Sequence, residues 1–116
     1  RRARNAVEFT GPAETIIGQP IEVLSQVEEA HFVSQGLTLN IPEATGFVAD
    51  LGGGSLEVVK LERGTAQHST SFNFGHLSMV TADEIQEAFD RTPWLAGDSD
   101  TKIFGVGGSF RALGLA

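Results

Sequence analysis

The sequence Asp50-Leu51-Gly52-Gly53-Gly54-Ser55-Leu56-Glu57 carries most of the information about the fold. It joins two apolar runs, residues 46–51 and 56–61, which predict two strands connected by a tight turn. Three consecutive glycines remove every Cβ from that turn, so backbone N–H groups can converge on an anion such as a phosphate. An ordinary turn rarely needs three glycines flanked by acids. We therefore predict that Gly52, Gly53, Gly54 and Ser55, the glycine turn, bind phosphate.

The glycine turn is not one of the two most common phosphate-binding motifs. A Walker A loop needs Gly-Lys-Ser/Thr before a helix, and the dinucleotide-binding fingerprint also opens a helix, whereas a strand is predicted here. A second glycine pair, Gly107-Gly108, follows a predicted strand at residues 103–106 and precedes a helix predicted from Phe110. A phosphate or nucleotide beside that helix N-terminus and close strand–helix packing explain this pair equally well.

Three carboxylates carry the predicted chemistry. Asp50 ends an apolar strand, where a buried unpaired charge is costly, so it should face a cavity, a metal or water. Glu57 begins the return strand, where it either turns back towards the same site or faces solvent. Hard oxygen ligands beside a phosphate suit Mg²⁺, which is usually held by one or two protein carboxylates. Glu28 completes a capping box with Ser25, but Glu29 has no such structural explanation beyond a favourable helix dipole.

The remaining pattern predicts an α/β chain with a β-meander and flanking helices. Gly and Pro punctuate the elements, and two capping boxes mark helix starts. The predicted elements are a helix within residues 1–9, a break at Thr10-Gly11-Pro12, a short helix at 14–17 ended by Gly18, a strand at 21–24, a helix from Ser25 to Gln35 ended by Gly36, a third meander strand at 65–74, and a helix that begins at Thr81 and is closed by Pro93.

Length and charge limit the class of protein. The chain has 116 residues, enough for one domain, and a net charge of -7, which argues against general binding of nucleic acid or anionic membranes. No apolar run approaches the length of about 20 residues that a membrane span needs. The chain has no cysteine, which excludes disulfides and thiolate metal sites. It starts without an initiator Met and stops inside an apolar pattern, so we expect a piece of a larger protein.

The histidines and the tryptophan give no sign of a site. His31, His68 and His76 show neither metal-ligand spacing nor a triad arrangement, so we predict surface or satisfied side chains. Trp94 follows Pro93 and is predicted to anchor its loop to the core.

Four ordered blocks of the chain resemble the exopolyphosphatase/guanosine pentaphosphate phosphohydrolase (Ppx/GppA) family. The family's motifs are Arg-x-Ala-x-Asn-x-x-x-Phe, Ile-Glu-Val-Ile-Ser-Gly-x-Glu-Glu-Ala, Asp-Ile-Gly-Gly-Gly-Ser-Thr-Glu, and Ser-x-Pro-x-Gly with a later Gly-Gly-Thr turn. The matching residues here are Arg1 with Asn5 and Phe9, residues 21–25 with 28–30, residues 50–57, and residues 71–75 with 105–113. The resemblance covers nearly the whole chain.

The resemblance implies a ribonuclease H-like, actin-like ATPase domain fragment. Residues 1–45 would end the first domain and form the linking segment, and residues 46–116 would start the second domain. It also implies release of the terminal phosphate of inorganic polyphosphate or guanosine pentaphosphate. Glu29 would be the base that activates water, Asp50 and Glu57 would organise Mg²⁺ and the attacking water, and Arg1 and the glycines of both turns, including Gly107 and Gly108, would bind phosphate.

Three positions depart from the family pattern: Gln26 replaces a Gly, Leu56 replaces a Thr, and Asn73 stands where the family often has Pro. The family's first phosphate hairpin, Asp-x-Gly-Ser-Asn, is absent, so we expect half of a two-walled cleft and no activity from these residues alone. Alternatives are an actin-like ATPase or sugar kinase and a non-catalytic phosphate- or nucleotide-binding module. We expect a cytoplasmic protein without nucleic-acid or membrane partners, with a homodimer as one option for the full-length protein.

Overall fold

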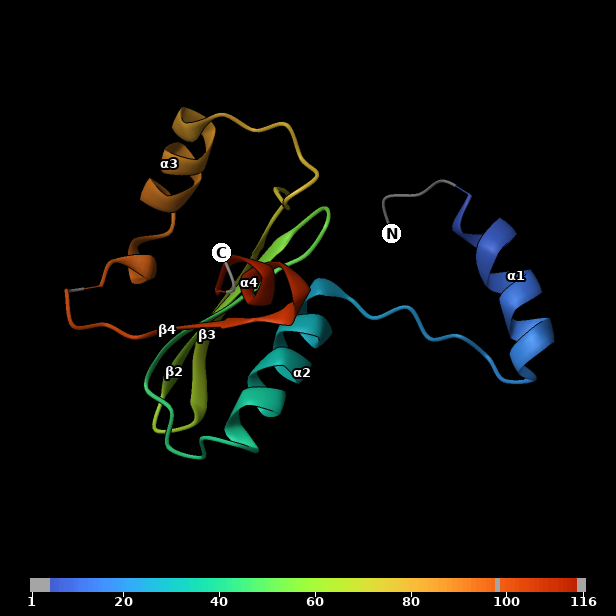
Figure 1. Ribbon diagram of the computed structural model, residues 1–116, viewed down its shortest axis with the longest axis horizontal. Helices are drawn as coiled ribbons and strands as arrows, with labels where there is room; N and C mark the ends of the chain where they lie inside the picture. The colour runs from blue at the N-terminus through green and yellow to red at the C-terminus, as the bar shows by residue number, and fades with distance from the viewer. Residues whose placement is uncertain (1–4, 98, 115–116) are drawn as a thin grey trace.

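A four-stranded mixed sheet forms the centre of the computed structural model, which describes residues 5–97 and 99–114 (Figure 1). The strand order is β3-β2-β1-β4. β2 is antiparallel to both β1 and β3, and β4 is parallel to β1, which confirms the predicted meander and mixed sheet. The strands are β1 (Gly46–Leu51), β2 (Leu56–Glu62), β3 (Thr65–Phe72) and β4 (Ile103–Val106).

Helix α2, Gln26–Thr38, covers one face of this sheet. Its predicted capping box is present: the Glu28 backbone N–H donates to the Ser25 hydroxyl, and the Glu28 carboxylate accepts from the Ser25 backbone N–H. The helix continues two residues past Gly36, where we predicted its end, because the Leu39 N–H still donates to the Gln35 carbonyl. The core between this helix and the sheet consists of small and branched residues: Ala30, Ala44, Val48, Val59 and Leu61.

Helix α3, Ala82–Asp90, and the 3₁₀ turn η1, Pro93–Leu95, cover the opposite face. The predicted capping box of Thr81 and Glu84 is present. Trp94 packs against a second core, built on Phe47, Val58 and Phe72, so its predicted role as a loop anchor is confirmed. The sheet is therefore the middle of three layers, with a separate apolar core on each side.

Two predictions near the N-terminus are wrong. Residues 10–12 do not break the first helix: α1 runs continuously over Ala6–Ile17, because Pro12 removes only one N–H donor and has a φ compatible with a helix. The predicted terminator Gly18 does end it, at φ 73°. Residues 21–24 form no strand, because no edge of the described sheet pairs with them. They are the extended link from α1 to α2, and α1 lies apart from the sheet (Figure 1).

Helix α4, Gly107–Gly114, begins three residues earlier than predicted and includes the second glycine pair in its first turn.

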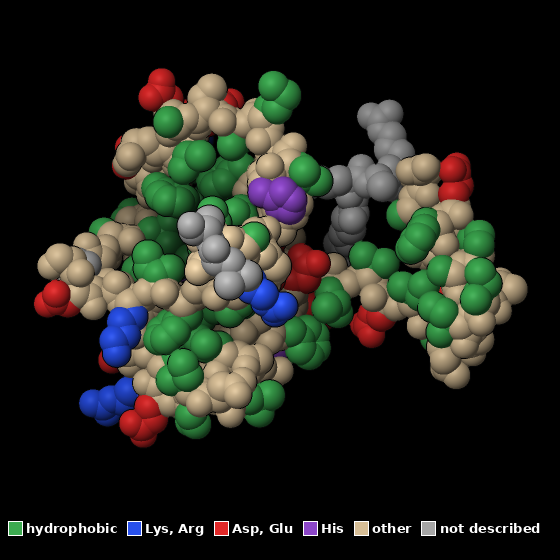
Figure 2. All heavy atoms as spheres, viewed as in Figure 1, with side chains coloured by type: hydrophobic (Ala, Val, Ile, Leu, Met, Phe, Trp, Pro, Cys, Tyr) green, Lys and Arg blue, Asp and Glu red, His purple; other side chains and the backbone are tan. Residues whose placement is uncertain are grey.

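Helix α1 leaves apolar side chains exposed to solvent, among them Val7, Phe9 and Ile16 (Figure 2). No helix in the described part of the chain is both long and apolar enough to cross a membrane.

Candidate functional site

The β1–β2 hairpin places the two predicted metal-site acids directly opposite each other. Asp50 and Glu57 are register partners, and the glycine turn closes the hairpin with a 2.9 Å hydrogen bond from the Gly52 N–H to the Ser55 carbonyl. Directly opposed residues on antiparallel strands have Cβ atoms about 4.5–5.5 Å apart. Asp50 and Glu57, the acidic pair, therefore lie next to each other at the end of the sheet that carries the glycine turn.

Alternation along the strands turns the acidic pair towards α2. Val48 and Val59, which lie two residues from Asp50 and Glu57, belong to the core under α2, and side chains two apart in a strand share a face. Glu57 is only 5% exposed. Its carboxylate accepts a 2.9 Å hydrogen bond from the hydroxyl of Ser71, its register partner on β3. The buried acid is thus held by a hydroxyl from the neighbouring strand.

The electrostatics of the pair favour a bound cation. Partial burial raises the pKa of Asp50 above its ordinary value, and the nearby Glu57 charge raises this pKa further. Within residues 5–97 and 99–114, neither acid forms an ion pair with a basic side chain. Two adjacent carboxylates without a basic partner fit a divalent cation that takes its remaining ligands from water and phosphate. The described residues contain no cluster of three or more acids, histidines or cysteines that could hold a metal alone.

The second glycine turn lies beside Asp50. Val106, the last residue of β4, is the parallel register partner of Asp50, so Gly107 follows at the same end of the sheet. A Cβ on Gly107 would lie 2.5 Å from Asp50 Oδ1, and its φ of 84° also disfavours any side chain. Gly107 thus lets the α4 N-terminus approach the acid. A Cβ on Gly108 would meet open space, so no packing contact explains that second glycine.

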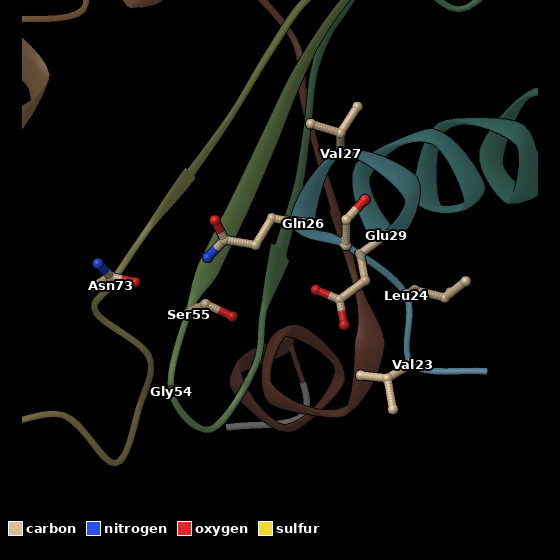
Figure 3. Close-up of a pocket in the computed structure, with 9 residues that line it drawn as sticks. Val23, Leu24, Gln26, Val27, Glu29, Gly54, Ser55 and Asn73 are labelled. Carbon is tan, nitrogen blue, oxygen red and sulfur yellow. The ribbon is translucent and has the colours of Figure 1, made fainter. Parts of the chain in front are cut away.

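Glu29 faces the glycine turn from α2 across a cavity of about 840 Å³. Gly54 and Ser55 line the opposite side (Figure 3). The Glu29 carboxylate points into this space (Figure 3) and is exposed to solvent. The structure therefore brings the predicted base, the acidic pair and both glycine turns to one end of the sheet. The remaining predicted phosphate ligand, Arg1, lies outside the described residues.

The three departures from the family pattern fall on different sides of the sheet. Gln26 and Asn73 line the cavity beside Glu29, so both change the lining of the candidate site. Leu56 instead packs against the core on the opposite face, with Phe47 and Val58. The hydroxyl that a Thr would carry at position 56 would therefore point away from the acidic pair.

The sequence did not predict two contacts at this end of the sheet. Ser71 belongs to a matching block, but no role was expected for it, because its pairing with Glu57 depends on strand register. His76 is exposed and hydrogen-bonded, which confirms the prediction of a surface or satisfied residue, but its position was not predicted: its Nδ1 lies 3.0 Å from the Gly52 carbonyl oxygen and 3.2 Å from Ser109 Oγ. The available signal in the sequence was the adjacent glycine, Gly75. A Cβ at position 75 would lie 2.4 Å from the Gly52 oxygen, so a glycine is needed for this segment to approach the glycine turn.

Comparison with known proteins gives one family. Residues 1–87 match the profile of the Ppx/GppA phosphatase family. The chain is 28% identical to a solved exopolyphosphatase-like protein, with a TM-score of 0.72 over 92% of this chain and 41% of that one. It is 25% identical to the Aquifex aeolicus PPX-GPPA enzyme, with a TM-score of 0.62 over 94% of this chain and 41% of that one.

The fold extends to a more distant structure. An exopolyphosphatase from Cytophaga hutchinsonii is 20% identical and has a TM-score of 0.70 over 96% of this chain and 42% of that one. The expected actin-like ATPase fold is therefore confirmed, as a sheet with flanking helices. The chain spans about two-fifths of the length of these solved relatives.

Proposed function

Because the chain belongs to the Ppx/GppA phosphatase family, we propose that it supplies one wall of a phosphohydrolase active site. The substrate would be inorganic polyphosphate or guanosine pentaphosphate, and the product would be its terminal phosphate. The observation that carries this proposal is the convergence of Glu29, the acidic pair and both glycine turns at one end of the sheet. We also propose a domain boundary after residue 45, a cytoplasmic location, and a homodimer for the full-length protein.

In this mechanism, the glycine turn and the α4 N-terminus bind oxygens of the terminal phosphate through backbone N–H groups. The Glu29 carboxylate takes a proton from a water molecule, whose oxygen attacks the terminal phosphorus. The phosphoanhydride P–O bond breaks, and the shortened phosphate leaves with the bonding electrons. Ser71 keeps the Glu57 carboxylate in place through its hydrogen bond.

Asp50 and Glu57 would hold Mg²⁺, since the pair offers hard oxygen donors and lacks a basic partner among the described residues. When bound, Mg²⁺ supplies neutralisation of the charge that develops on the transferred phosphoryl group. Arg1 is proposed to contact phosphate as well.

The test is phosphate release by the full-length protein with Mg²⁺, from polyphosphate and from guanosine pentaphosphate in parallel. Glu29→Gln should lower kcat by at least about 100-fold, the usual contribution of a general base, with little change in substrate binding. Glu28→Gln is the matched control, because a Gln at that position still completes the capping box and should leave kcat near the wild-type value.

The results separate this proposal from its alternatives. Normal turnover by Glu29→Gln would show that the base is another group. Release of phosphate from ATP alone would favour an ATPase or kinase. If the wild-type protein binds polyphosphate and releases nothing, it is a non-catalytic binding module, an outcome for which Gln26 in the cavity provides a reason.

A further inference from the structure

The imidazole of His76 lies between the two glycine turns. Its Nδ1 is 3.0 Å from the Gly52 carbonyl oxygen and 3.2 Å from the Ser109 hydroxyl oxygen, which belongs to the first turn of α4. The three residues come from the glycine turn, the segment after β3, and α4, so one ring contacts both predicted phosphate-binding elements.

The backbone on either side of His76 strengthens this attachment. The His76 N–H donates to the Gly52 carbonyl at 3.0 Å, and the Leu77 N–H donates to the Gly53 carbonyl at 2.9 Å. Gly75 is buried, and a Cβ there would lie within 2.5 Å of backbone atoms of the glycine turn. The segment after β3 therefore packs directly against the glycine turn, and the imidazole extends this contact to α4.

The tautomer of His76 decides which group donates in these two contacts. A carbonyl oxygen only accepts, so Nδ1 must carry a hydrogen to bond with Gly52. The same N–H faces Ser109 Oγ, which then also accepts. With the hydrogen on Nδ1, the hydroxyl hydrogen of Ser109 is directed away from His76 and can donate to an anion beside the α4 N-terminus.

We propose that His76 is a positioning residue that holds the two glycine turns in register and orients the Ser109 hydroxyl towards bound phosphate. This proposal rests on the proposed function, because it assumes that phosphate binds between these turns. His76 itself neither contacts the reacting atoms nor transfers a proton.

Amide substitutions give a sharp test in the full-length protein. In Asn the side-chain nitrogen lies close to the position of Nδ1, whereas in Gln it lies near that of Nε2. His76→Ala and His76→Gln should raise the KM for polyphosphate about fivefold to tenfold, the usual effect of one lost hydrogen bond, with kcat within about twofold. His76→Asn should restore a KM near the wild-type value. His68→Ala is the control, because His68 stacks on Trp94 and bonds to neither turn.

A measurement independent of activity separates this proposal from the proposed function. Nitrogen NMR of ¹⁵N-histidine-labelled protein should show His76 with its hydrogen on Nδ1 at neutral pH, and Ser109→Ala should shift that signal. If the wild-type protein releases no phosphate, the proposed function fails, while the NMR signature still decides whether the ring bonds to Gly52. A neutral His76 with its hydrogen on Nε2, an unchanged KM in His76→Ala, or a KM in His76→Asn as high as in His76→Gln would overturn the proposal.

Discussion

The two faces of the central sheet are built from the same strands but have different chemistry. On the face towards α2, the apolar core stops before the end of the sheet, and Asp50, Glu57 and Ser71 continue the three strands. On the face towards α3, Phe72 and Leu56 keep the surface apolar to the same end. Both faces carry an apolar core, but only the face towards α2 replaces apolar packing at its end with polar groups beside the glycine turn.

The largest expected effect on stability is on the apolar face. Phe72→Ala removes a ring that is 8% exposed and contacts the rings of Phe74 and Phe89. It should lower the free energy of unfolding by about 3–5 kcal/mol, because it leaves a cavity in the core. Urea unfolding followed by Trp94 fluorescence measures this, and a loss below about 1 kcal/mol would contradict the assignment of Phe72 to the core.

The next effect is at the polar end of the opposite face. Ser71→Ala deletes the hydroxyl that donates to the buried Glu57 carboxylate. The unfolding free energy should fall by about 1–3 kcal/mol, because the buried carboxylate loses its donor. Ser69→Ala is the control on the same strand, since Ser69 is exposed. Equal stability of the two variants in urea would show that the Ser71 bond contributes nothing.

Leu56→Thr restores the hydroxyl that the family pattern has at this position. Because Leu56 packs on the apolar face, the change should cost about 1–2 kcal/mol of unfolding free energy and leave kcat within about twofold. Phosphate release by the full-length protein and urea unfolding are measured together. A tenfold change in kcat at unchanged stability would place residue 56 in the site instead.

Asp50→Asn gives the smallest stability change, and its sign is opposite. The raised pKa of Asp50 means that the folded state binds its proton more readily, so the stabilisation present below the ordinary value of 3.8 is lost as the pH rises. Without Mg²⁺ at pH 7, Asp50→Asn should therefore be more stable than wild type by a few tenths to about 1 kcal/mol. At pH 3 the difference should vanish. Unfolding curves at both pH values test this.

Local signals in the sequence predicted most of the fold. Both capping boxes are present, and the two apolar runs at residues 46–51 and 56–61, with the glycines between them, predicted the hairpin. The predictions of a break in the first helix and of a strand at residues 21–24 were wrong, because both depend on more than local propensity. Local propensity does not show whether a helix tolerates a proline, nor whether a strand finds a partner. The sequence predicted individual site residues but not the contacts between them. Its Ser71 and His76 contacts depend on register and loop packing between segments far apart in the chain.

The most direct test of the central claim, that the polar end of the α2 face is the reactive site, is the kcat of full-length Asp50→Asn with Mg²⁺. The claim predicts a fall of at least about 100-fold in phosphate release, in a variant that is as stable as wild type or more stable at pH 7 without the metal. Phosphate release at the wild-type rate from the same stable variant would contradict the claim.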